Sequence, residues 1–479
     1  MRPPIHEYRR FFACSSRPLV AVGRSPLAAM VMLMLFPSTV APARGDTVVT
    51  GTGIPVVVPD VPSIGANLDF IAGDGNPAVL QLLIGGTYSG EWSITDVGAI
   101  FTLGGGSLVI APTAGTGTAS GAANLSAQDG TLQLGANSFL TGFGTGGTGG
   151  TLSASNGGRL VIDDDRWLTN MVLLQLGGSW TAGSDATLTY SGASDITSGA
   201  DVSLTGTAAA IALSGAGSFE LTGDIQGSGD LVVASGGGTG TVNLSFGSGS
   251  FTGTTIIDNA SASINTQNSI GTEGLTFIGA TVTAGTALTL GAAQVFELGG
   301  TSTLTGGGAG LTAFNVNGGM TGSGDITLTG INMTVGGTTS SYNGGITLAG
   351  AAGRESTITT TNAAWLGGVS SLTMANNTSL TYAGTDAGTY GGAIVTGTTA
   401  GDRALVFTSG AGNGDLTLSG TVSGAGDLVI GASSGSTATT TLALTSPLAG
   451  TFAGRTVIED ANVAINTQTS IGEDRKSVV

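Results

Sequence analysis

The sequence predicts an all-β protein, a solenoid of short strands, and three observations favour this fold. A glycine turn followed by alternating apolar residues recurs along the chain, as in "GSGDLVV" (227–233) and "GAGDLVI" (424–430). A long segment is nearly duplicated further along the chain. No proline occurs between residues 113 and 446, as expected where strands form backbone hydrogen bonds on both sides.

The composition is typical of a folded, turn-rich protein. Glycine supplies 86 of the 479 residues, only 9% are charged, and the mean hydropathy is +0.35. Disordered chains are usually poor in valine, isoleucine and leucine, whereas these residues alternate throughout this sequence. The chain therefore has the apolar side chains that a long core requires.

The N-terminus predicts an export signal. Several arginines precede the apolar run "LAAMVMLMLF" (27–36), and Ala41 and Ala43 form an A-x-A cleavage site. We expect residues 1–43 to be an extended signal peptide of the Sec type, 44–60 to be a linker and 61–473 to be the repeat body. The apolar run is short for a bilayer span, so we expect no direct membrane span in this fragment.

Charge and rare residues exclude several functions. The chain has 13 basic and 30 acidic residues, and five of the arginines lie in the leader, so the body is acidic and is not expected to bind nucleic acid. The single histidine (His6) and the single cysteine (Cys14) also lie in the leader. Once the predicted leader is cleaved, the exported body has no histidine and no cysteine. This excludes Ser-His-Asp and Cys-His catalysis and zinc sites built on these residues, and no cofactor is expected.

A Gly-x-Gly-Asp turn begins the clearest repeats. Each copy places a tight turn directly before a short strand whose alternate side chains point one way. We expect the aspartates to cap nearby backbone N–H groups, because the motif lacks the spacing of calcium-binding nonapeptides. The turn and core positions assigned to these repeats are Gly227, Gly229, Leu231, Gly322, Gly324, Gly424, Gly426 and Leu428.

The duplication indicates how the modules stack. Residues 221–233 match 418–430, and "FTGTTIIDNASASINTQNSIG" (251–271) matches "FAGRTVIEDANVAINTQTSIG" (452–472). Apolar residues and glycines agree, while charged and small polar residues differ. This pattern is typical of inward-facing and turn positions in coils of about 20–25 residues that stack on one another.

Residues 227–265 resemble the autotransporter-associated β-strand repeat. "GTVNL" (240–244) and "FTGTT" (251–255) occupy the strand and turn of that repeat. The resemblance implies a right-handed parallel β-helix passenger, exported by a Gram-negative bacterium and displayed at the cell surface by a C-terminal outer-membrane barrel. No barrel lies in this chain, so we expect it in cis beyond residue 473.

The last six residues, "DRKSVV" (474–479), interrupt the repeat and contain the only lysine. They match a translation of the start of a widely used sequencing adapter. We interpret 474–479 as an adapter artefact and the chain as a passenger cut off within a repeat.

Two segments are candidate binding sites. Asp163, Asp164, Asp165 and Arg166 lie in "RLVIDDDRW" (159–167), and clustered carboxylates could hold an acidic sugar or a metal, as in enzymes that act on polysaccharides. We favour the alternative, a solvated loop where one coil departs from the repeat. Arg44, Gly45 and Asp46 spell the integrin-binding tripeptide.

Three functional hypotheses follow. The leading hypothesis is a non-enzymatic, surface-displayed passenger, an adhesin or biofilm-type stalk that contacts host-cell or glycan surfaces. The second is a passenger that carries a polysaccharide-acting enzyme site near 159–167. The third is a freely secreted repeat protein that binds a ligand or an ordered surface through Thr/Ser faces such as "TITTTN" (357–362).

Overall fold

The computed structural model describes the body of the chain from Thr47 onwards, with gaps. Strand backbones are described between residues 47 and 110. Side chains are described for most of 124–177 and for 187–337, 340–350, 353–408, 414–433, 436–443 and 452–466. The predicted signal peptide with Ala41 and Ala43, the tripeptide Arg44–Asp46 and the segment 474–479 lie outside the described residues.

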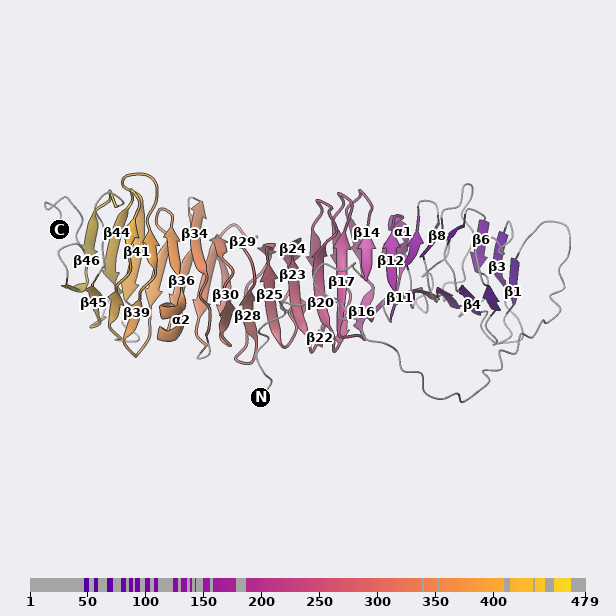
Figure 1. Ribbon diagram of the computed structural model, residues 1–479, viewed down its shortest axis with the longest axis horizontal. Helices are drawn as coiled ribbons and strands as arrows, with labels where there is room; N and C mark the ends of the chain where they lie inside the picture. Colours follow the sequence, from indigo (N-terminus) through magenta and orange to yellow (C-terminus); the bar gives the residue numbers. More distant parts are fainter. Residues whose placement is uncertain are drawn as a thin grey trace, which may run out of the picture. The chain divides into compact units, whose positions relative to one another are not determined.

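The body is a right-handed parallel β-helix, which confirms the predicted fold class (Figure 1). Each strand pairs in parallel with the strand one coil earlier and the strand one coil later. Thr312 pairs with Ile331, 19 positions further on, and Leu160 pairs with Leu188, 28 positions further on. The coil length therefore varies somewhat more than the repeat predicts, because corner loops differ in length while strand registers are kept.

Chain order arranges the strands on three faces. The first face begins with a nine-stranded sheet of β2 (Val56–Val58), β4 (Val79–Leu82), β7 (Ile100–Leu103), β9 (Asn124–Ala127), β11 (Thr151–Ala154), β13 (Leu173–Leu176), β16 (Asp201–Leu204), β19 (Ile225–Gly227) and β22 (Gly249–Phe251). It continues with β27 (Leu288–Leu290), β30 (Thr312–Val316), β33 (Ile331–Val335), β36 (Thr357–Thr360), β38 (Ser379–Tyr382), β41 (Arg403–Thr408), β44 (Asp427–Ala432) and β46 (Thr456–Glu459).

The second face follows the same plan. Its longer sheet comprises β5 (Gly86–Tyr88), β8 (Ser107–Ile110), β10 (Thr131–Leu134), β12 (Arg159–Ile162), β14 (Leu188–Tyr190), β17 (Ala208–Leu213), β20 (Asp230–Ser235), β23 (Thr254–Asp258), β25 (Gly274–Ile278), β28 (Val295–Leu298) and β31 (Met320–Gly322). It continues with β39 (Gly388–Tyr390), β42 (Leu416–Leu418), β45 (Thr439–Leu442) and β47 (Asn462–Ile465).

The third face begins with β1 (Thr47–Thr50), β3 (Asn67–Ile71) and β6 (Glu91–Ile94). Its main sheet comprises β15 (Ile196–Ser198), β18 (Phe219–Leu221), β21 (Val242–Leu244), β24 (Ser261–Ile264), β26 (Thr281–Ala284), β29 (Ser302–Gly306), β32 (Ile326–Thr329), β34 (Gly345–Ala351), β37 (Ser371–Met374), β40 (Ala393–Val395) and β43 (Val422–Ser423). The two-residue strand β35 (Arg354–Glu355) pairs antiparallel with β34.

The segment 44–60, which the sequence analysis predicts to be a linker, contains two strands in the part that the structure describes. β1 and β2 lie within it and pair in parallel with β3 and β4. "TVVT" and "VVV" are β-branched runs that suit a ladder, so the stack of coils begins before residue 61.

Inward-facing side chains form one continuous core. Leu132, Leu160, Leu188 and Ile211 occupy successive rungs of the second face, and each is fully buried. Strands such as β10, β11 and β12 alternate partly exposed and buried residues. The apolar alternation in the sequence therefore corresponds to the inside of the solenoid.

Close contact between coils accounts for the motif glycines. Gly227, Gly322 and Gly424 have φ values of +125°, +95° and +108°, where other residues are strained. A Cβ on Gly227 would lie 2.0 Å from the carbonyl oxygen of Leu204 in the preceding coil. The Gly-x-Gly pattern thus marks points where two backbones approach each other too closely for a side chain.

The motif aspartates join neighbouring coils. The Asp230 carboxylate accepts a hydrogen bond from the backbone N–H of Thr254, at 2.7 Å, one coil later. Asp325 accepts in the same way from Gly345 at 2.7 Å, and Asp427 from Arg455 at 2.9 Å. The fourth copy, Asp415, accepts from Thr439 at 2.8 Å. The aspartates do cap backbone N–H groups, but in the next coil and not in their own turn.

The duplicated segments share a local turn-and-strand structure but lie on different faces, since β20 belongs to the second face and β44 to the first. Leu231 pairs with Thr255 in the first copy, and Leu428 pairs with Thr456 in the second. The corners that follow also agree, since Asn259 and Asp460 are aligned and both adopt left-handed backbone conformations, with φ of 50° and 49°. Asn and Asp are the residues other than glycine that tolerate this conformation best.

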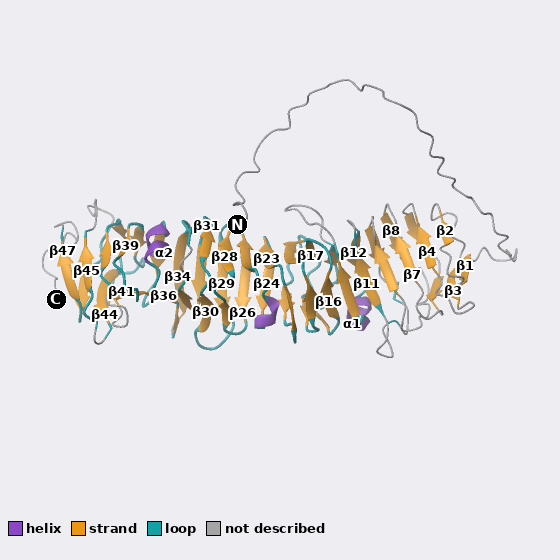
Figure 2. Cartoon of the chain, turned by 90° about the horizontal axis from the view of Figure 1, so that it is seen from below, coloured by secondary structure: helices purple, strands orange, loops and turns teal. Residues whose placement is uncertain are grey.

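Each face changes from one sheet to the next at a short helix. The helix α1 (Asp165–Asn170) packs beside β15 on the third face, and α2 (Ala363–Gly368) packs beside β39 on the second. On the first face the 3-10 helix η2 (Gln267–Ser269) contacts β22, and the Gln267 side-chain amide exchanges two hydrogen bonds with the Thr289 backbone in β27. Figure 2 shows α1 and α2 in purple along the stack of strands.

We predict that Gly227→Ala destabilises the protein by more than about 2 kcal/mol, because the methyl group adds strain at positive φ and overlaps the Leu204 carbonyl. Gly310→Ala is the matched control, since no atom lies within 4 Å of its Cβ position, and its effect should stay within about 0.5 kcal/mol. Urea unfolding compares the two variants. Equal effects would refute the close-approach argument.

We predict that Asp230→Ala costs about 1–2 kcal/mol, because the N–H of Thr254 loses its acceptor. Asp230→Asn keeps an oxygen at that place and should cost less. Hydrogen exchange read at the Thr254 amide should accelerate in the alanine variant more than in the asparagine variant. Unchanged exchange in both variants would contradict the role of the carboxylate.

Candidate site at the Asp163–Trp167 segment

The candidate segment begins where β12 ends and the chain enters α1. Asp164 is the N-cap of the helix, with extended backbone dihedrals, and its carboxylate accepts from the backbone N–H of Arg166 at 3.1 Å. At the other end, the N–H of Met171 donates to the carbonyl of Trp167. An acidic N-cap satisfies N–H groups that the first turn leaves free, so Asp164 has a structural task.

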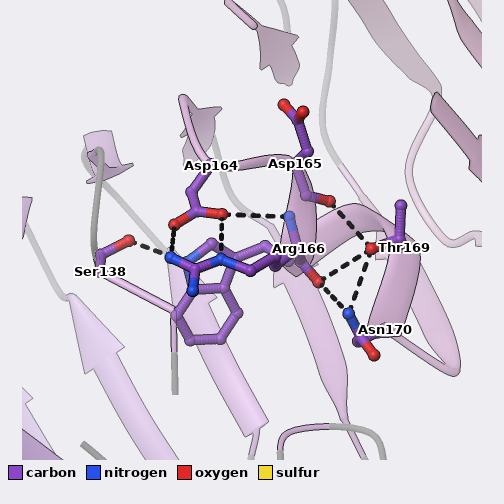
Figure 3. Close-up of polar contacts among 7 residues, drawn as sticks. Ser138, Asp164, Asp165, Arg166, Thr169 and Asn170 are labelled. Atoms are coloured by element: carbon purple, nitrogen blue, oxygen red, sulfur yellow. Dashed lines mark hydrogen bonds and ion pairs between the residues drawn. The ribbon is translucent and has the colours of Figure 1, made fainter. Parts of the chain in front are cut away.

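Asp164 and Arg166 form a bidentate ion pair (Figure 3). Arg166 Nε lies 2.8 Å from one carboxylate oxygen and Nη2 lies 2.5 Å from the other. Burial raises the pKa of the Asp164 carboxyl, but the hydrogen bonds and charge of Arg166 outweigh burial and hold this pKa below its usual value. The Arg166 guanidinium also lies over the Phe139 ring, 5.1 Å from its centre.

The other two carboxylates bind different partners. Asp163 accepts from Gln133 Nε2 at 2.7 Å and from the Ser191 hydroxyl, which lie on coils before and after it. Asp165 lies 2.6 Å from the hydroxyl of Tyr190, and burial together with Asp165 raises the pKa of that phenol. In Figure 3 the Asp165 carboxylate points away from that of Asp164. The three acidic groups therefore do not converge on a common point.

Trp167 anchors the helix to the core. Its side chain is fully buried, and the indole N–H donates to the Ser138 hydroxyl at 2.8 Å. Phe139 and Phe143 meet the indole edge to face, with ring centres 5.3 and 4.8 Å away. A buried aromatic cluster with a satisfied N–H stabilises a fold, and it offers no exposed ring on which a sugar could stack.

The helix α2 has the same capped N-terminus and buried tryptophan as α1, but it lacks the charged residues. Asn362 caps α2 through a hydrogen bond from the Trp365 N–H at 2.9 Å, and Val369 closes the helix as Met171 closes α1. Trp365 and Leu366 are buried, like Trp167 and Leu168. Thr361, Ala363 and Ala364 stand where α1 has Asp163, Asp165 and Arg166.

Two copies of one helical insertion therefore share a cap, a tryptophan and a leucine. These two helices were not related by the sequence analysis, because both lie where the turn-and-strand repeat is interrupted. The signal was the "WL" pair (167–168 and 365–366), which recurs at the spacing of the main duplication. The departure from the repeat was predicted correctly, but the segment is a capped helix with a buried tryptophan and not a simple loop.

A shallow hollow lies at the corner between the second and third faces. It encloses about 130 Å³ and is lined mainly by glycine, small residues and backbone, together with Asn259, Ser261 and Thr281. None of its lining residues carries a charge, so the hollow offers no acid or base that could activate the serine and threonine hydroxyls in its lining.

Within the described residues, no group of three His, Cys, Asp or Glu side chains is placed to hold a metal ion. In the same part of the chain, no helix is both long and apolar enough to cross a membrane. Comparisons of the chain with protein-family models, curated proteins and solved structures give no match.

We predict that Asp164→Ala destabilises the coil around α1 by about 1–2 kcal/mol through loss of the N-cap. Asp164→Asn should cost less, because asparagine caps α2 at the equivalent position. Thermal unfolding of both variants checks the order. Equal losses in the two variants would show that the ion pair, which both lack, dominates over the cap.

The stabilising effect of the Asp164 charge should depend on pH. Because its folded-state pKa is below the unfolded value of about 3.9, the contribution is fully present above that value and is lost as pH falls through the folded pKa. The stability difference between the parent protein and Asp164→Asn should therefore shrink below about pH 4. A difference that is constant from pH 7 to pH 3 would contradict this assignment.

Proposed function

We propose that the chain is a non-enzymatic passenger, exported and presented at the bacterial surface as a stalk for adhesion or biofilm formation. The observation that carries the proposal is a long solenoid in which the best catalytic candidates, the aspartates of 163–165, already make structural contacts. Asp163, Asp164 and Asp165 each have a protein partner, and a second helix does the same structural task without them.

The physics of a solenoid suits such a stalk. Each coil packs mainly against its neighbours, so length can be added without a larger core. Stability comes from parallel ladders and clamps such as Asp427 with the Arg455 backbone, without a disulfide in the body. A protein of this kind can reach away from a surface and present its faces and corner loops.

The proposed export rests on the leader and on the repeat resemblance. An N-terminal signal followed by a cysteine-free, glycine-rich β-helix is the arrangement that an outer-membrane barrel translocates and displays. The barrel in cis is the partner that this proposal requires.

The proposal is tested with the complete reading frame expressed in a Gram-negative host. Antibody labelling of intact cells and release of the body by external protease are the expected results. Purified body is then incubated with host cells and glycan arrays, with Arg44–Asp46 present or replaced by Ala-Gly-Ala. A protein that stays in the periplasm would refute display, and display without any binding would refute adhesion.

We predict no lyase or hydrolase activity on acidic or neutral polysaccharides. Reducing-end and unsaturated-product assays are run on the parent protein and on Asp164→Asn. An activity present in the parent and lost in Asp164→Asn, with the fold retained, would overturn the non-enzymatic assignment in favour of an enzyme at 159–167.

A further inference from the structure

We propose that the outer surface of the third face, from β26 to β37, binds ice. This inference deepens the proposed function by naming the surface to which the protein adheres. The observation is a two-dimensional array of threonines, here called the threonine face, that the strand registers bring together. Its members are Thr281, Thr283, Thr303, Thr305, Thr327, Thr329, Thr347 and Thr373.

The registers place these residues in two straight columns. Thr281 pairs with Thr303, which pairs with Thr327, and the column continues through Thr347 to Thr373. The second column runs beside it, from Thr283 through Thr305 to Thr329. Three successive strands therefore each present a Thr-x-Thr pair in register. Chain positions alone do not reveal this, because the pairs are separated by corners of different length.

The array points outward and is free to bind. Val282, Leu304 and Leu328, which lie between the paired threonines, are fully buried, whereas Thr281 is exposed and the other threonines are partly exposed. The hydroxyls of the threonine face make no side-chain hydrogen bond to the described part of the protein. Each therefore has its donor and its acceptors available for a partner.

The lattice is rigid and regular. Neighbouring strands lie about 4.8 Å apart, and alternate residues of one strand lie about 6.6 Å apart. The face is therefore a nearly rectangular grid of hydroxyl and methyl groups. Threonine is stiff at χ1 and its backbone is held in ladders, so little entropy is lost when a periodic surface is bound.

The chemistry of the face selects the partner. Outward positions within these strands carry no charged and no aromatic side chain. Asp325 and Arg354 lie at the strand ends, where Asp325 accepts from the Gly345 N–H and Arg354 donates to the Gly306 carbonyl, so both charges are engaged within the protein. A charged mineral or a polyanion would require charges, and sugar rings are usually held by stacking on aromatic side chains. A grid of uncharged hydroxyls and methyls matches a lattice of water molecules, which offers donors and acceptors at regular intervals and no charge.

The first face supplies an internal control. Thr334, Thr359 and Thr381 form one polar column there, but the neighbouring column contains Asn332, Thr357 and Ser379 and then Leu405. Thr357 also donates to the Asn332 side chain at 2.8 Å, so its hydroxyl is engaged within the protein. This face has a polar stripe without a uniform grid.

The experiment uses the purified full chain and its variants. Each protein is mixed with a slowly growing ice hemisphere, the fraction incorporated into the ice is measured, and inhibition of ice recrystallisation is recorded in parallel. Thr305→Tyr and Thr327→Tyr place a ring in the centre of the grid. Thr359→Tyr is the matched control on the first face, and Thr327→Val removes a hydroxyl while it keeps the shape. Circular dichroism and thermal unfolding confirm that each variant is folded.

The expected result is incorporation of the parent protein and of Thr359→Tyr, with a loss of about tenfold or more in the two tyrosine variants, because contacts across a grid act together. Exclusion of the parent protein from ice overturns the proposal. Equal incorporation of parent, Thr305→Tyr and Thr327→Tyr also overturns it. Binding to crystalline cellulose or chitin that needs the same threonines, without incorporation into ice, assigns the face to a polysaccharide and overturns ice as the partner.

These outcomes are separate from those of the display experiment. Ice binding is measured on soluble protein and does not depend on export, whereas surface labelling does not depend on ice. A displayed protein that ice excludes would leave the stalk proposal standing and remove only this inference.

Discussion

The structure depends on one constraint, which is that each coil must match the backbone of the next coil in register. Parallel ladders run along all three faces, further backbone hydrogen bonds join the coils at the corners, and the inward side chains stack in one core. Where two backbones approach closely at a corner, only glycine fits, as at Gly227 and Gly253. Where an N–H at a corner has no ladder partner, an aspartate from the previous coil accepts from it, as at Asp230. The glycines and the aspartate of the repeat motif are therefore the residues that allow one coil to pack in register on the next.

The same constraint explains where the repeat is interrupted. A strand that ends on one face leaves edge groups unpaired, and the short helices occupy these places. Gln267 in η2 substitutes for a strand by pairing its amide with the Thr289 backbone. The helices α1 and α2 use a buried tryptophan to fill the core where a strand would otherwise contribute side chains. The short helices therefore satisfy backbone groups and fill the core at the ends of the sheets, and the unusual residues in them stabilise the fold.

This view changes the meaning of the acidic segment 163–165. Three aspartates beside an arginine resemble a catalytic cluster when they are read along the chain. In space they separate, because Asp163 bonds to neighbouring coils, Asp164 caps a helix and Asp165 meets Tyr190. The outward threonines, by contrast, attract no attention along the chain and become an ordered array only when the coils are stacked. In a solenoid, a binding surface is therefore recognised by comparing residues that are paired between neighbouring coils, and not residues that are close along the chain.

The sequence by itself determined the all-β class, the approximate coil length and the inward positions, because apolar alternation, glycine turns and the duplication all follow local rules. It also predicted that Gly227 and Leu231 share their local turn-and-strand structure with Gly424 and Leu428, although the two copies lie on different faces. Only the tertiary structure decided the partners of the aspartates, the start of the solenoid at β1, the paired tryptophan helices and the alignment of the threonines. The physical reason is that each of these depends on which residue lies one coil away. That distance varies from 19 to 28 positions, and corner lengths, which no local pattern specifies, set it.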